Sequence, residues 1–385
     1  MINILYIHQS SELYGSDKTL LCLIRGIDRS KYKPIVVLPG EGPLKEALTS
    51  ESIQVIVTPV IKLHRKMFKP GYMASLPFEI IKSLKHIKKE IVGTKVDIVQ
   101  SNTLAVLLGV FLAQRLKAKH VWHVHEIITH PKLISNLYPK LLNRYADQIV
   151  CNSHATLHNL LSRNSKLEGK IRVVHNGLDP NEFLPKDSRQ NLLGYSANDT
   201  VITLVGRISK LKGHQLLLKV FRDHLAGDPN VKLLFTGSPV PGQEYYLEEL
   251  EQKIAAFKLD SQVKILPFQK DLSEIWNATN IAVSPSTEAE SFGLVALEAM
   301  FSKIPVVATN LGGLKEVVVD NETGFLFENK NEEALKEALQ KLISSPELRA
   351  QFGVAGFKRA NAEFTLEKYI AGFEQIYEKL IPQIN

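Results

Sequence analysis

The sequence predicts an α/β protein made of two Rossmann-like, doubly wound parallel-sheet domains, and three observations support this. The chain has 385 residues, which is too long for one ordinary hydrophobic core. Short runs rich in Ile and Val alternate with amphipathic helical stretches, the pattern of a parallel sheet with helices on both faces. The alternation stops in a polar, turn-rich segment at residues 181–198 and then restarts, which indicates a linker.

The first domain is predicted over residues 1–180. Each of its strands is a short apolar run, and helical periods separate most of them. The predicted strands are Ile2–Ile7, Pro34–Leu38, Ile53–Val57, Asp97–Gln100, His120–Val124, Gln148–Cys151 and Ile171–Val174.

The second domain is predicted over residues 199–363. Its strands are Val201–Val205, Val231–Phe235, Val263–Leu266, Ile281–Ser284 and Val306–Ala308. From Glu332 onward the pattern is almost entirely helical, and we expect a last helix at about 364–385 to pack back on the first domain. Two facing domains of this kind form an interdomain cleft, where ligands bind at the carboxyl ends of the strands.

Composition and charge narrow the function classes. A hydrophobic content of 44% and a charged fraction of 23% are those of a globular protein. The sequence has no run of 18 apolar residues, and Met1–His8 lacks the features of a secretory signal. We therefore expect a cytoplasmic protein. The net charge of +7 suggests an anionic partner. The sequence shows no platform of aromatic and basic residues of the kind that binds nucleic acid, so we do not expect a nucleic-acid partner.

The stretch Ile61–Lys89 has a strong excess of basic over acidic residues. Aliphatic residues interleave with the lysines at helical spacing, which fits a surface for an anionic membrane, on the inner face of the plasma membrane. An apolar stripe on the domain core with simply solvated lysines is an equal alternative. The basic residues are Lys62, Arg65, Lys66, Lys69, Lys82, Lys85, Lys88 and Lys89, against the single acid Glu79.

Two carboxylates flank a Phe-Gly step in the stretch E-S-F-G-L-V-A-L-E at Glu290–Glu298. Read as one helix, the eight-residue step from Glu290 to Glu298 covers about 12 Å, roughly the separation between the two hydroxyl-rich ends of a nucleotide diphosphate sugar. Free amides at the helix start, around Phe292 and Gly293, suit phosphate oxygens. Glu290 would then bind sugar hydroxyls and Glu298 ribose hydroxyls. In the alternative reading, Glu290 is an N-terminal helix cap and Glu298 is a solvated helix residue.

Two loops after strands of the second domain carry further candidates. The first, G-R-I-S-K-L-K-G-H at Gly206–His214, places Arg207 and Lys212 where they can clamp a diphosphate and neutralise its charge. The second, F-T-G-S, contains Gly237, which lets a ligand approach the backbone. In the alternative reading, the first loop carries two solvated surface cations and the second is a plain turn.

Taken together, these motifs resemble those of a retaining group 1 (family 4) glycosyltransferase of the GT-B type. The matching segments of the second half are Gly206–His214, Pro285–Met300, Pro305–Thr309, Gly312–Gly313, Glu316 and Thr323–Leu326. The first half matches at Tyr14-Gly15-Ser16, where the family usually has a Gly-Gly pair, at Trp122–Glu126 and at His175–Asp179. The resemblance implies that the first domain binds the acceptor and the second binds the nucleotide sugar.

The resemblance also implies residue roles. Arg207 and Lys212 match the pair that holds the donor diphosphate, Glu290 the carboxylate near the transferred sugar, and Glu298 the ribose-binding carboxylate. His125 falls where the family places a histidine close to the sugar, although His123, two positions away, stays open as an alternative. Catalysis is thus assigned to Glu290, His125, Arg207 and Lys212. We expect the donor to be bound by Gly15, Gly206, Arg207, Lys212, Gly237, Glu290, Ser291, Phe292, Gly293, Leu294, Val295 and Glu298.

The predicted reaction moves a hexose from a UDP- or GDP-sugar to a hydroxyl of a saccharide or lipid-linked acceptor, with retention, in cell-surface polysaccharide or glycolipid biosynthesis. The sequence has no Asp-any-Asp segment for a divalent ion, so we expect no metal or other cofactor. A sugar-nucleotide epimerase of the same fold and a non-catalytic nucleotide-sugar-binding protein remain alternatives. A dinucleotide oxidoreductase is disfavoured because no G-x-G-x-x-G follows either opening strand.

Overall fold

The computed structural model describes residues 1–62, 70–183 and 193–382, with side chains of the third helix from Leu76 onward. Three of the predicted basic residues, Arg65, Lys66 and Lys69, and half of the predicted linker lie outside the described residues. The chain divides into two compact units. Unit 1 consists of Met1–Leu178 and Leu366–Asn385, and unit 2 consists of Asp179–Thr365.

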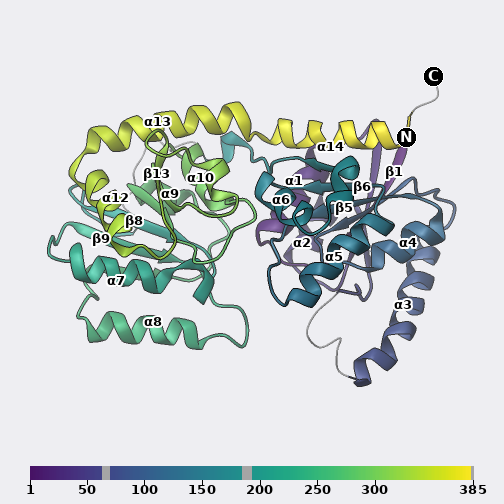
Figure 1. Cartoon of the computed structure of the whole chain (residues 1–385), viewed down its shortest axis with the longest axis horizontal. Helices are drawn as coiled ribbons and strands as arrows, with labels where there is room; N and C mark the ends of the chain where they lie inside the picture. Colours follow the sequence, from purple (N-terminus) through teal and green to yellow (C-terminus); the bar gives the residue numbers. More distant parts are fainter. Residues whose placement is uncertain (63–69, 184–192, 383–385) are drawn as a thin grey trace. The chain divides into compact units, whose positions relative to one another are not determined.

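Unit 1 is built on a seven-stranded sheet in the order β3-β2-β1-β4-β5-β6-β7. Figure 1 shows this sheet among its helices. All the neighbouring strands are parallel. The strand order reverses beside β1, so the carboxyl ends of β1 and β4 form the switch point where such sheets bind ligands. The strands are β1 Ile2–His8, β2 Tyr32–Leu38, β3 Gln54–Val57, β4 Ile98–Asn102, β5 Lys119–Val124, β6 Gln148–Cys151 and β7 Ile171–Val173.

Helices cover both faces of this sheet because crossovers between parallel strands keep one hand. The first and second helices and the last one pack on one face, and the third to sixth pack on the other. These helices are α1 Gly15–Gly26, α2 Pro43–Ser50, α3 Pro70–Glu90, α4 Leu108–Leu116, α5 Lys132–Tyr145, α6 His154–Leu161 and α14 Leu366–Leu380.

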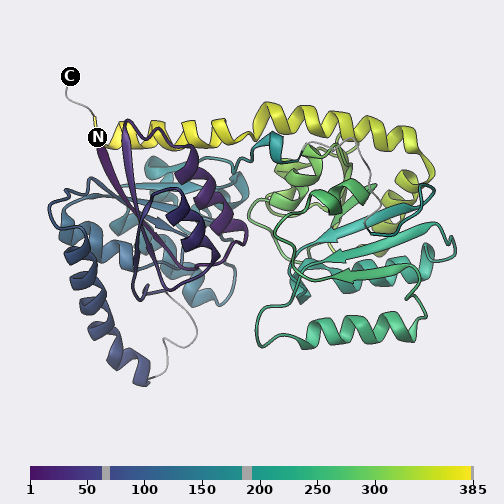
Figure 2. The same cartoon turned by 180° about the vertical axis from the view of Figure 1, so that it is seen from behind.

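The last helix, α14, is part of the core of unit 1, where it packs against α1 (Figure 2). Its buried residues include Tyr369, Phe373 and Tyr377. The Tyr377 hydroxyl donates to Oε1 of Gln100 on β4 at 2.6 Å and lies 3.2 Å from the Tyr6 hydroxyl. Each buried aromatic side chain of this kind contributes about 2 to 3 kcal/mol. The helix is therefore held both by apolar burial and by hydrogen bonds to the sheet.

Unit 2 contains a six-stranded parallel sheet in the order β10-β9-β8-β11-β12-β13. Its strands are β8 Thr200–Val205, β9 Val231–Thr236, β10 Val263–Leu266, β11 Ile281–Ser284, β12 Val306–Thr309 and β13 Gly324–Phe327. Its α-helices are α7 His214–His224, α8 Tyr245–Ala256, α9 Ser273–Ala278, α10 Leu294–Phe301, α11 Leu314–Val317, α12 Glu332–Ser344 and α13 Pro346–Glu363.

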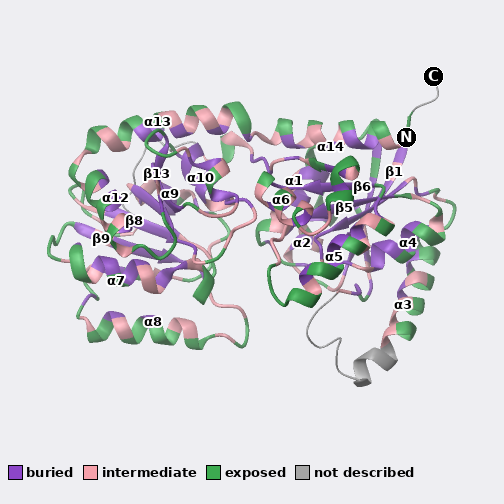
Figure 3. Ribbon diagram, viewed as in Figure 1, coloured by how far each residue is buried: buried purple, intermediate pink, exposed green. Residues whose placement is uncertain are grey.

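The two sheets confirm the predicted fold class, since the apolar strands are buried under helices on both faces (Figure 3). One strand, β13, is absent from the prediction. It has four residues and begins with Gly324, a weak strand former, whose backbone packs tightly on Val306. Among the described helices, none is long and apolar enough to cross a membrane.

Candidate functional site

In unit 2, the loops after β8 and β9 are joined at the carboxyl end of the sheet. Gly206 donates from its backbone to Thr236 at 2.9 Å, and Ile208 donates to Ser238 at 3.2 Å. Gly237 is buried with a φ of +150°, and a Cβ there would lie 2.0 Å from the Gly206 carbonyl oxygen. The need for glycine at 237 is thus explained by contact between the two loops.

The central contact of this cluster is an ion pair between Lys212 and Glu290. Lys212 follows β8 and Glu290 follows β11, yet Nζ of Lys212 donates to Oε1 of Glu290 at 2.8 Å. Their side chains are only 25% and 19% exposed. The Ser286 hydroxyl also donates to Oε1 of Glu290. A cation and a carboxylate predicted from separate motifs therefore lie side by side.

The charges around Glu290 decide its protonation. Burial alone would raise the pKa of its carboxyl, but Lys212, the Ser286 hydroxyl and the nearby charge of Arg207 together lower the pKa below its ordinary value. Arg207 itself is exposed. The carboxylate stays ionised at neutral pH and can accept hydrogen bonds from a hydroxyl-bearing ligand.

Backbone contacts hold the loop that carries Glu290 in place. Thr287 donates from its backbone to the Leu211 carbonyl at 2.8 Å, and Gly313 donates to the Glu290 carbonyl at 2.7 Å. Gly213 has a φ of +77°, and a Cβ there would lie 2.0 Å from the Pro285 carbonyl oxygen. Close backbone packing therefore fixes the loop from both sides, which supports precise placement of the carboxylate.

The predicted helix start near Phe292 and Gly293 is confirmed, but the separation obtained by reading Glu290–Glu298 as one helix does not hold. The helix α10 begins only at Leu294 with Gly293 as its N-cap, so Glu290 lies in the preceding loop. Gly293 has a φ of +112°, which turns the chain sharply between them. The carboxylates therefore do not have the separation of a continuous helix, although Glu298 is in α10 as expected.

The remaining predicted residues of this segment lie around the start of α10. Phe292 is buried, whereas Ser291, Leu294 and Val295 are half-buried. First-turn amides of a helix have no acceptor within the helix and can bind anions. Glu298 is 4% exposed, which contradicts the alternative reading of a solvated helix residue.

In unit 1, a histidine pair lies at the carboxyl end of β5. The rings of His123 and His125 are 3.8 Å apart between centroids, with His123 fully buried and His125 half-buried. Nδ1 of His123 lies 3.0 Å from Oδ1 of Asn102, at the end of β4, and 3.0 Å from Nε2 of His125. Of the two, only His125 has surface left for a ligand.

Burial sets the charge of the pair. It is the main cause that lowers the pKa of His125 to about 3, and it lowers the pKa of His123 well below the ordinary value, with neighbouring histidines adding to both effects. Both rings are therefore neutral at pH 7. Either can then donate one hydrogen bond and accept another.

Sequence reasoning missed Glu126, which comes directly after this pair. Its Oε2 accepts from the backbone amides of Leu104 at 2.9 Å and His125 at 3.1 Å. Burial outweighs these bonds and raises the pKa of Glu126 to about 7. Thr103, beside this loop, has a φ of +95°, an unusual backbone for a β-branched residue that is typical of functional sites.

Sequence reasoning also missed the residues beside the pair, His8 and Asp17. Nε2 of His8, the last residue of β1, bonds to Oδ1 of Asp17 in the first turn of α1, and both side chains are buried. The only signal in the sequence was that His8 directly follows the first predicted strand, because the link to the histidine pair depends on the pairing of β1 with β4. The predicted binding residue Gly15 is exposed at the start of α1, beside Tyr14.

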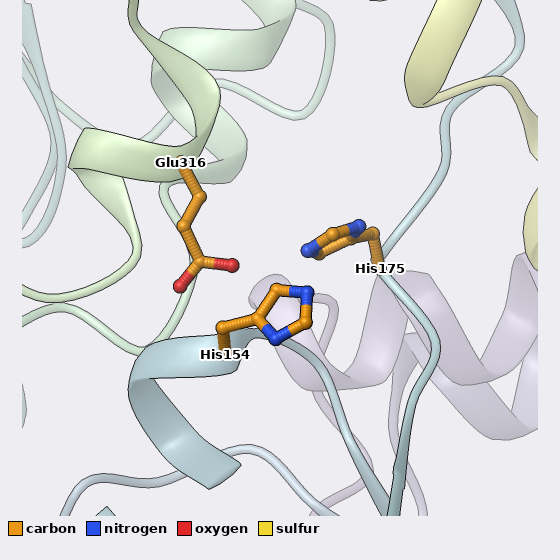
Figure 4. A group of neighbouring side chains, drawn as sticks. All are labelled: His154, His175 and Glu316. Atoms are coloured by element: carbon orange, nitrogen blue, oxygen red, sulfur yellow. The ribbon is translucent and has the colours of Figure 1, made fainter. Parts of the chain in front are cut away.

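Two further histidines of unit 1 lie at the same end of its sheet (Figure 4). His154 is the first residue of α6 and His175 follows β7, and their ring centroids are 5.6 Å apart. His175 begins the H-N-G-L-D segment. Figure 4 also draws Glu316, which belongs to α11 of unit 2.

Known families match both halves of the chain. Residues 15–182 match glycosyltransferase family 4, and residues 187–359 match the glycosyl transferases group 1. The D-inositol 3-phosphate glycosyltransferase of Rhodococcus opacus is 31% identical over 62% of this chain and 55% of that protein. The capsular polysaccharide biosynthesis glycosyltransferase CapM of Staphylococcus aureus is 30% identical over 64% of this chain and 65% of that protein.

The chain spans about half the length of the inositol-phosphate relatives, with matches covering 55%, 46% and 56% of three of them. Two solved structures match nearly the whole chain. Anabaena Alr3699/HepE, determined in complex with UDP-glucose, has a TM-score of 0.85 at 24% identity and covers 98% of this chain and 100% of that one. A Rickettsia africae glycosyltransferase has a TM-score of 0.83 at 22% identity, with 99% of each chain covered. These likenesses confirm the predicted GT-B fold.

Proposed function

The chain belongs to the group 1, family 4 glycosyltransferases, and we propose that it moves a hexose from a nucleotide diphosphate sugar to an acceptor hydroxyl. The observation that carries this proposal is the Lys212–Glu290 pair beside Arg207, at the carboxyl end of the unit 2 sheet. Two cations in such a place can bind the donor diphosphate and offset the charge that develops when the glycosidic bond breaks.

We assign the two carboxylates of unit 2 to the two ends of the donor. Glu290 is ionised and half-buried, so it can orient the transferred sugar through its hydroxyls. Glu298 is buried on α10, where it would bind the ribose hydroxyls. The amides at the start of α10, from Phe292 to Val295, would contact the phosphates between them.

His125 of unit 1 is assigned to the transferred sugar by the family resemblance. Its partial exposure supports this choice over His123, whose ring is fully buried. We propose retention by front-side attack, in which the leaving diphosphate accepts the proton of the acceptor hydroxyl. Arg207 and Lys212 would hold that diphosphate, so we propose that no divalent metal is needed.

The choice of donor and acceptor rests on the relatives. Alr3699/HepE binds UDP-glucose in its solved structure, which makes a UDP-sugar the first donor to test, with GDP-sugars next. CapM is named for capsular polysaccharide biosynthesis. We therefore propose a saccharide or lipid-linked saccharide acceptor and a place in cell-surface polysaccharide or glycolipid biosynthesis.

We further propose that the enzyme works on the cytoplasmic face of a membrane. On α3, Phe78 is 76% exposed and Ile81 is 50% exposed, among the exposed Lys82, Lys85 and Lys89. The neighbouring helices α4 and α5 add exposed apolar side chains on the same side of the sheet, namely Phe111, Leu133 and Leu137. Apolar side chains that enter the lipid boundary, flanked by lysines, fit an anionic bilayer surface.

Ligand-dependent stability and product analysis test the proposed activity. The purified chain is heated with a panel of UDP-, GDP- and ADP-sugars, and we expect one group to raise Tm. The selected donor is then incubated with and without saccharide acceptors. Transfer with retained anomeric configuration, and only slow hydrolysis without acceptor, is expected. Conversion of the sugar nucleotide without any acceptor would show an epimerase instead.

A further inference from the structure

A continuous chain of hydrogen bonds runs from α1 to the histidine pair of unit 1. Asp17 bonds to Nε2 of His8, and Nδ1 of His8 lies 2.9 Å from Nδ2 of Asn102. Oδ1 of the same amide lies 3.0 Å from Nδ1 of His123 and 3.3 Å from Nε2 of His125. The first four side chains are buried, so protons in the chain exchange little with water.

Asp17, at one end of this series of hydrogen bonds, fixes which atoms in it donate and which accept. One oxygen of its carboxylate, Oδ2, accepts from the Tyr14 amide at 2.9 Å and from the Ser10 hydroxyl at 3.3 Å. The other, Oδ1, faces Nε2 of His8. Because a carboxylate only accepts, the proton between them belongs to Nε2 of His8.

The contacts of Nδ1 of His8 determine the orientation of the next group. Nδ1 lies 2.9 Å from Nδ2 of Asn102 and farther, at 3.3 Å, from the Asn102 backbone carbonyl oxygen. The shorter contact makes Nδ1 an acceptor for the amide group, so the ring carries its proton on Nε2. The amide oxygen of Asn102 must then face the histidine pair, where it requires a donor. The orientation of the Asn102 side chain therefore depends on Asp17, and it places an acceptor oxygen towards the histidine pair at the carboxyl end of β5.

Only one proton fits between His123 and His125. Their facing nitrogens, Nδ1 and Nε2, are 3.0 Å apart, and two N–H groups would repel each other at that distance. If His125 carried the proton on Nε2, neutral His123 would carry its own on its other nitrogen, Nε2. That atom is buried and finds no hydrogen-bond partner among the described residues. An orphaned buried N–H is costly and rare, so the shared proton belongs to Nδ1 of His123.

We infer that Asp17, through His8 and Asn102, fixes the tautomers of the histidine pair, so that His125 accepts on Nε2 and keeps Nδ1–H as its donor. Asp17, His8 and Asn102 are positioning residues, since they act on His125 and not on a ligand. For catalysis the inference rests on the proposed function, in which His125 contacts the transferred sugar. A ring in the wrong tautomer would present a lone pair where a donor is needed. Loss of a tautomer-fixing carboxylate can cost turnover by orders of magnitude.

Asp17→Asn is the sharpest variant because it keeps the shape of the side chain. Its oxygen would stay with the Tyr14 amide, which needs an acceptor, so its NH2 would face Nε2 of His8. His8 must then move its proton to Nδ1, where it opposes Nδ2 of Asn102. The hydrogen bond from the Tyr14 amide at the start of α1 is preserved, while the donors and acceptors between residue 17 and Asn102 exchange roles.

The control is Asp97→Asn, also in unit 1. Asp97 immediately precedes β4, at the opposite end from the histidine pair, and its Oδ2 accepts from the Asn3 amide at 3.0 Å. A second test variant, Asn102→Asp, replaces the donor by an acceptor. We expect it to make His8 doubly protonated, and it keeps the inference testable if Asp17→Asn fails to fold.

The readout is NMR of the full chain with 15N-labelled histidine rings, because two-bond proton–nitrogen correlations separate the two tautomers and the imidazolium. Single His→Asn variants at positions 8, 123 and 125 assign the signals among the 12 histidines. At pH 7 we expect Nε2–H for His8 and Nδ1–H for both His123 and His125. In Asp17→Asn, His8 should change to Nδ1–H, whereas Asp97→Asn should leave all three unchanged. A charged or Nδ1-protonated His8 in the wild type, Nε2–H on His125, or no change in folded Asp17→Asn would overturn the inference.

Kinetics test the positioning role separately. We expect Asp17→Asn to lower kcat at least about tenfold with little change in the donor KM, and Asp97→Asn to leave both near wild type. A normal kcat in an Asp17→Asn protein whose His8 tautomer has changed would refute the positioning role. If the wild type transfers no sugar at all, the proposed function fails, and the NMR result still decides the tautomers.

Discussion

Lys212 and Glu290 form a hydrogen-bonded ion pair of 2.8 Å between the loops that follow β8 and β11 of unit 2. Burial of Glu290 would favour its neutral form, and Lys212 is the largest of the influences that oppose this. The lysine therefore has two effects: it keeps the carboxylate ionised, and it places positive charge beside it.

Replacing Lys212 by Met should remove both effects while preserving the bulk of the side chain. We expect kcat/KM with the selected donor to fall about 100- to 1000-fold, as for other preorganised charges in active sites. Steady-state kinetics measure this. Lys219→Met is the matched control, because Lys219 pairs with Glu332 at the surface of the same unit. Similar activity in the two variants would contradict the site assignment.

The same substitution should change the pH dependence of stability. The pKa of Glu290 is lowered in the folded state, so its stabilising contribution is present above the unfolded-state pKa and is lost as pH falls through the folded-state pKa. Without Lys212, burial acts with less opposition and raises the pKa. The difference in unfolding free energy between wild type and Lys212→Met should thus be larger at pH 7 than at pH 4, by urea denaturation.

Replacing Glu298 by Gln should weaken binding of the nucleotide through its ribose. Hydrogen bonds to a charged group are worth about 1.5 to 3 kcal/mol, which corresponds to a rise in the Kd of UDP of about 10- to 100-fold. Calorimetry with UDP and with 2′,3′-dideoxy-UDP measures this, and only the first ligand should lose affinity. Glu332→Gln, at a half-buried position of the same unit where the carboxylate pairs with Lys219, is the control. Equal losses for both ligands would place Glu298 away from the ribose.

The strands were predictable from sequence because their apolar runs are short, β-branched and buried on both faces. The exception is β13, where Gly324 and a length of four residues weaken the signal. The helix start near Gly293 was predictable from the Phe-Gly step, but the separation of Glu290 from Glu298 was not. A helical period continues through Glu290–Glu298, and only the backbone of Gly293, with its positive φ, shows that the chain turns before the helix.

Site residues that belong to sequence motifs were predictable, whereas contacts between residues far apart in the sequence were not. Lys212 and Glu290 stand out within their loops, but their contact depends on the neighbouring positions of β8 and β11 in the sheet. Asp17 and Asn102 show the limit more clearly. Asp17 is 85 positions from Asn102, and neither looks unusual in its own segment. They are connected only because β1 and β4 pair at the switch point.

Glu126 should make unit 1 less stable as pH rises. Its pKa is about 7 in the folded state, above the ordinary value of 4.5, so folding favours the protonated form. The stability that this provides is full below the unfolded-state pKa and is lost as pH rises towards 7. Glu126→Gln can still accept from the amides of Leu104 and His125 but does not titrate. The stability of the variant relative to wild type should therefore increase between pH 5 and pH 8, as measured by urea denaturation. A constant difference across this range would show that Glu126 titrates normally.

A chelator should leave transfer unchanged. The cations of Arg207 and Lys212 are proposed to hold the diphosphate that a divalent ion would otherwise neutralise. Initial rates are measured after dialysis against EDTA and again after addition of manganese or magnesium. Rates that vanish with the chelator and return with manganese would overturn the proposal of a metal-independent enzyme.

Membrane binding should depend on the exposed face of α3. The wild type should sediment with vesicles that contain phosphatidylglycerol, and less so as salt is raised, because lysines near an anionic surface each contribute about 1 kcal/mol that salt screens.

Phe78→Ser with Ile81→Ser should reduce this retention by removing the apolar contact, and Lys85→Glu with Lys89→Glu should reduce it by reversing charge. The control is Val354→Ser, because Val354 is 62% exposed on α13 of unit 2. Neither double variant should change slow hydrolysis of the soluble donor, since none of the substituted residues is assigned to donor binding. Equal retention on phosphatidylcholine vesicles, or no retention at low salt, would show that the lysines are simply solvated and that α3 only packs on its own core.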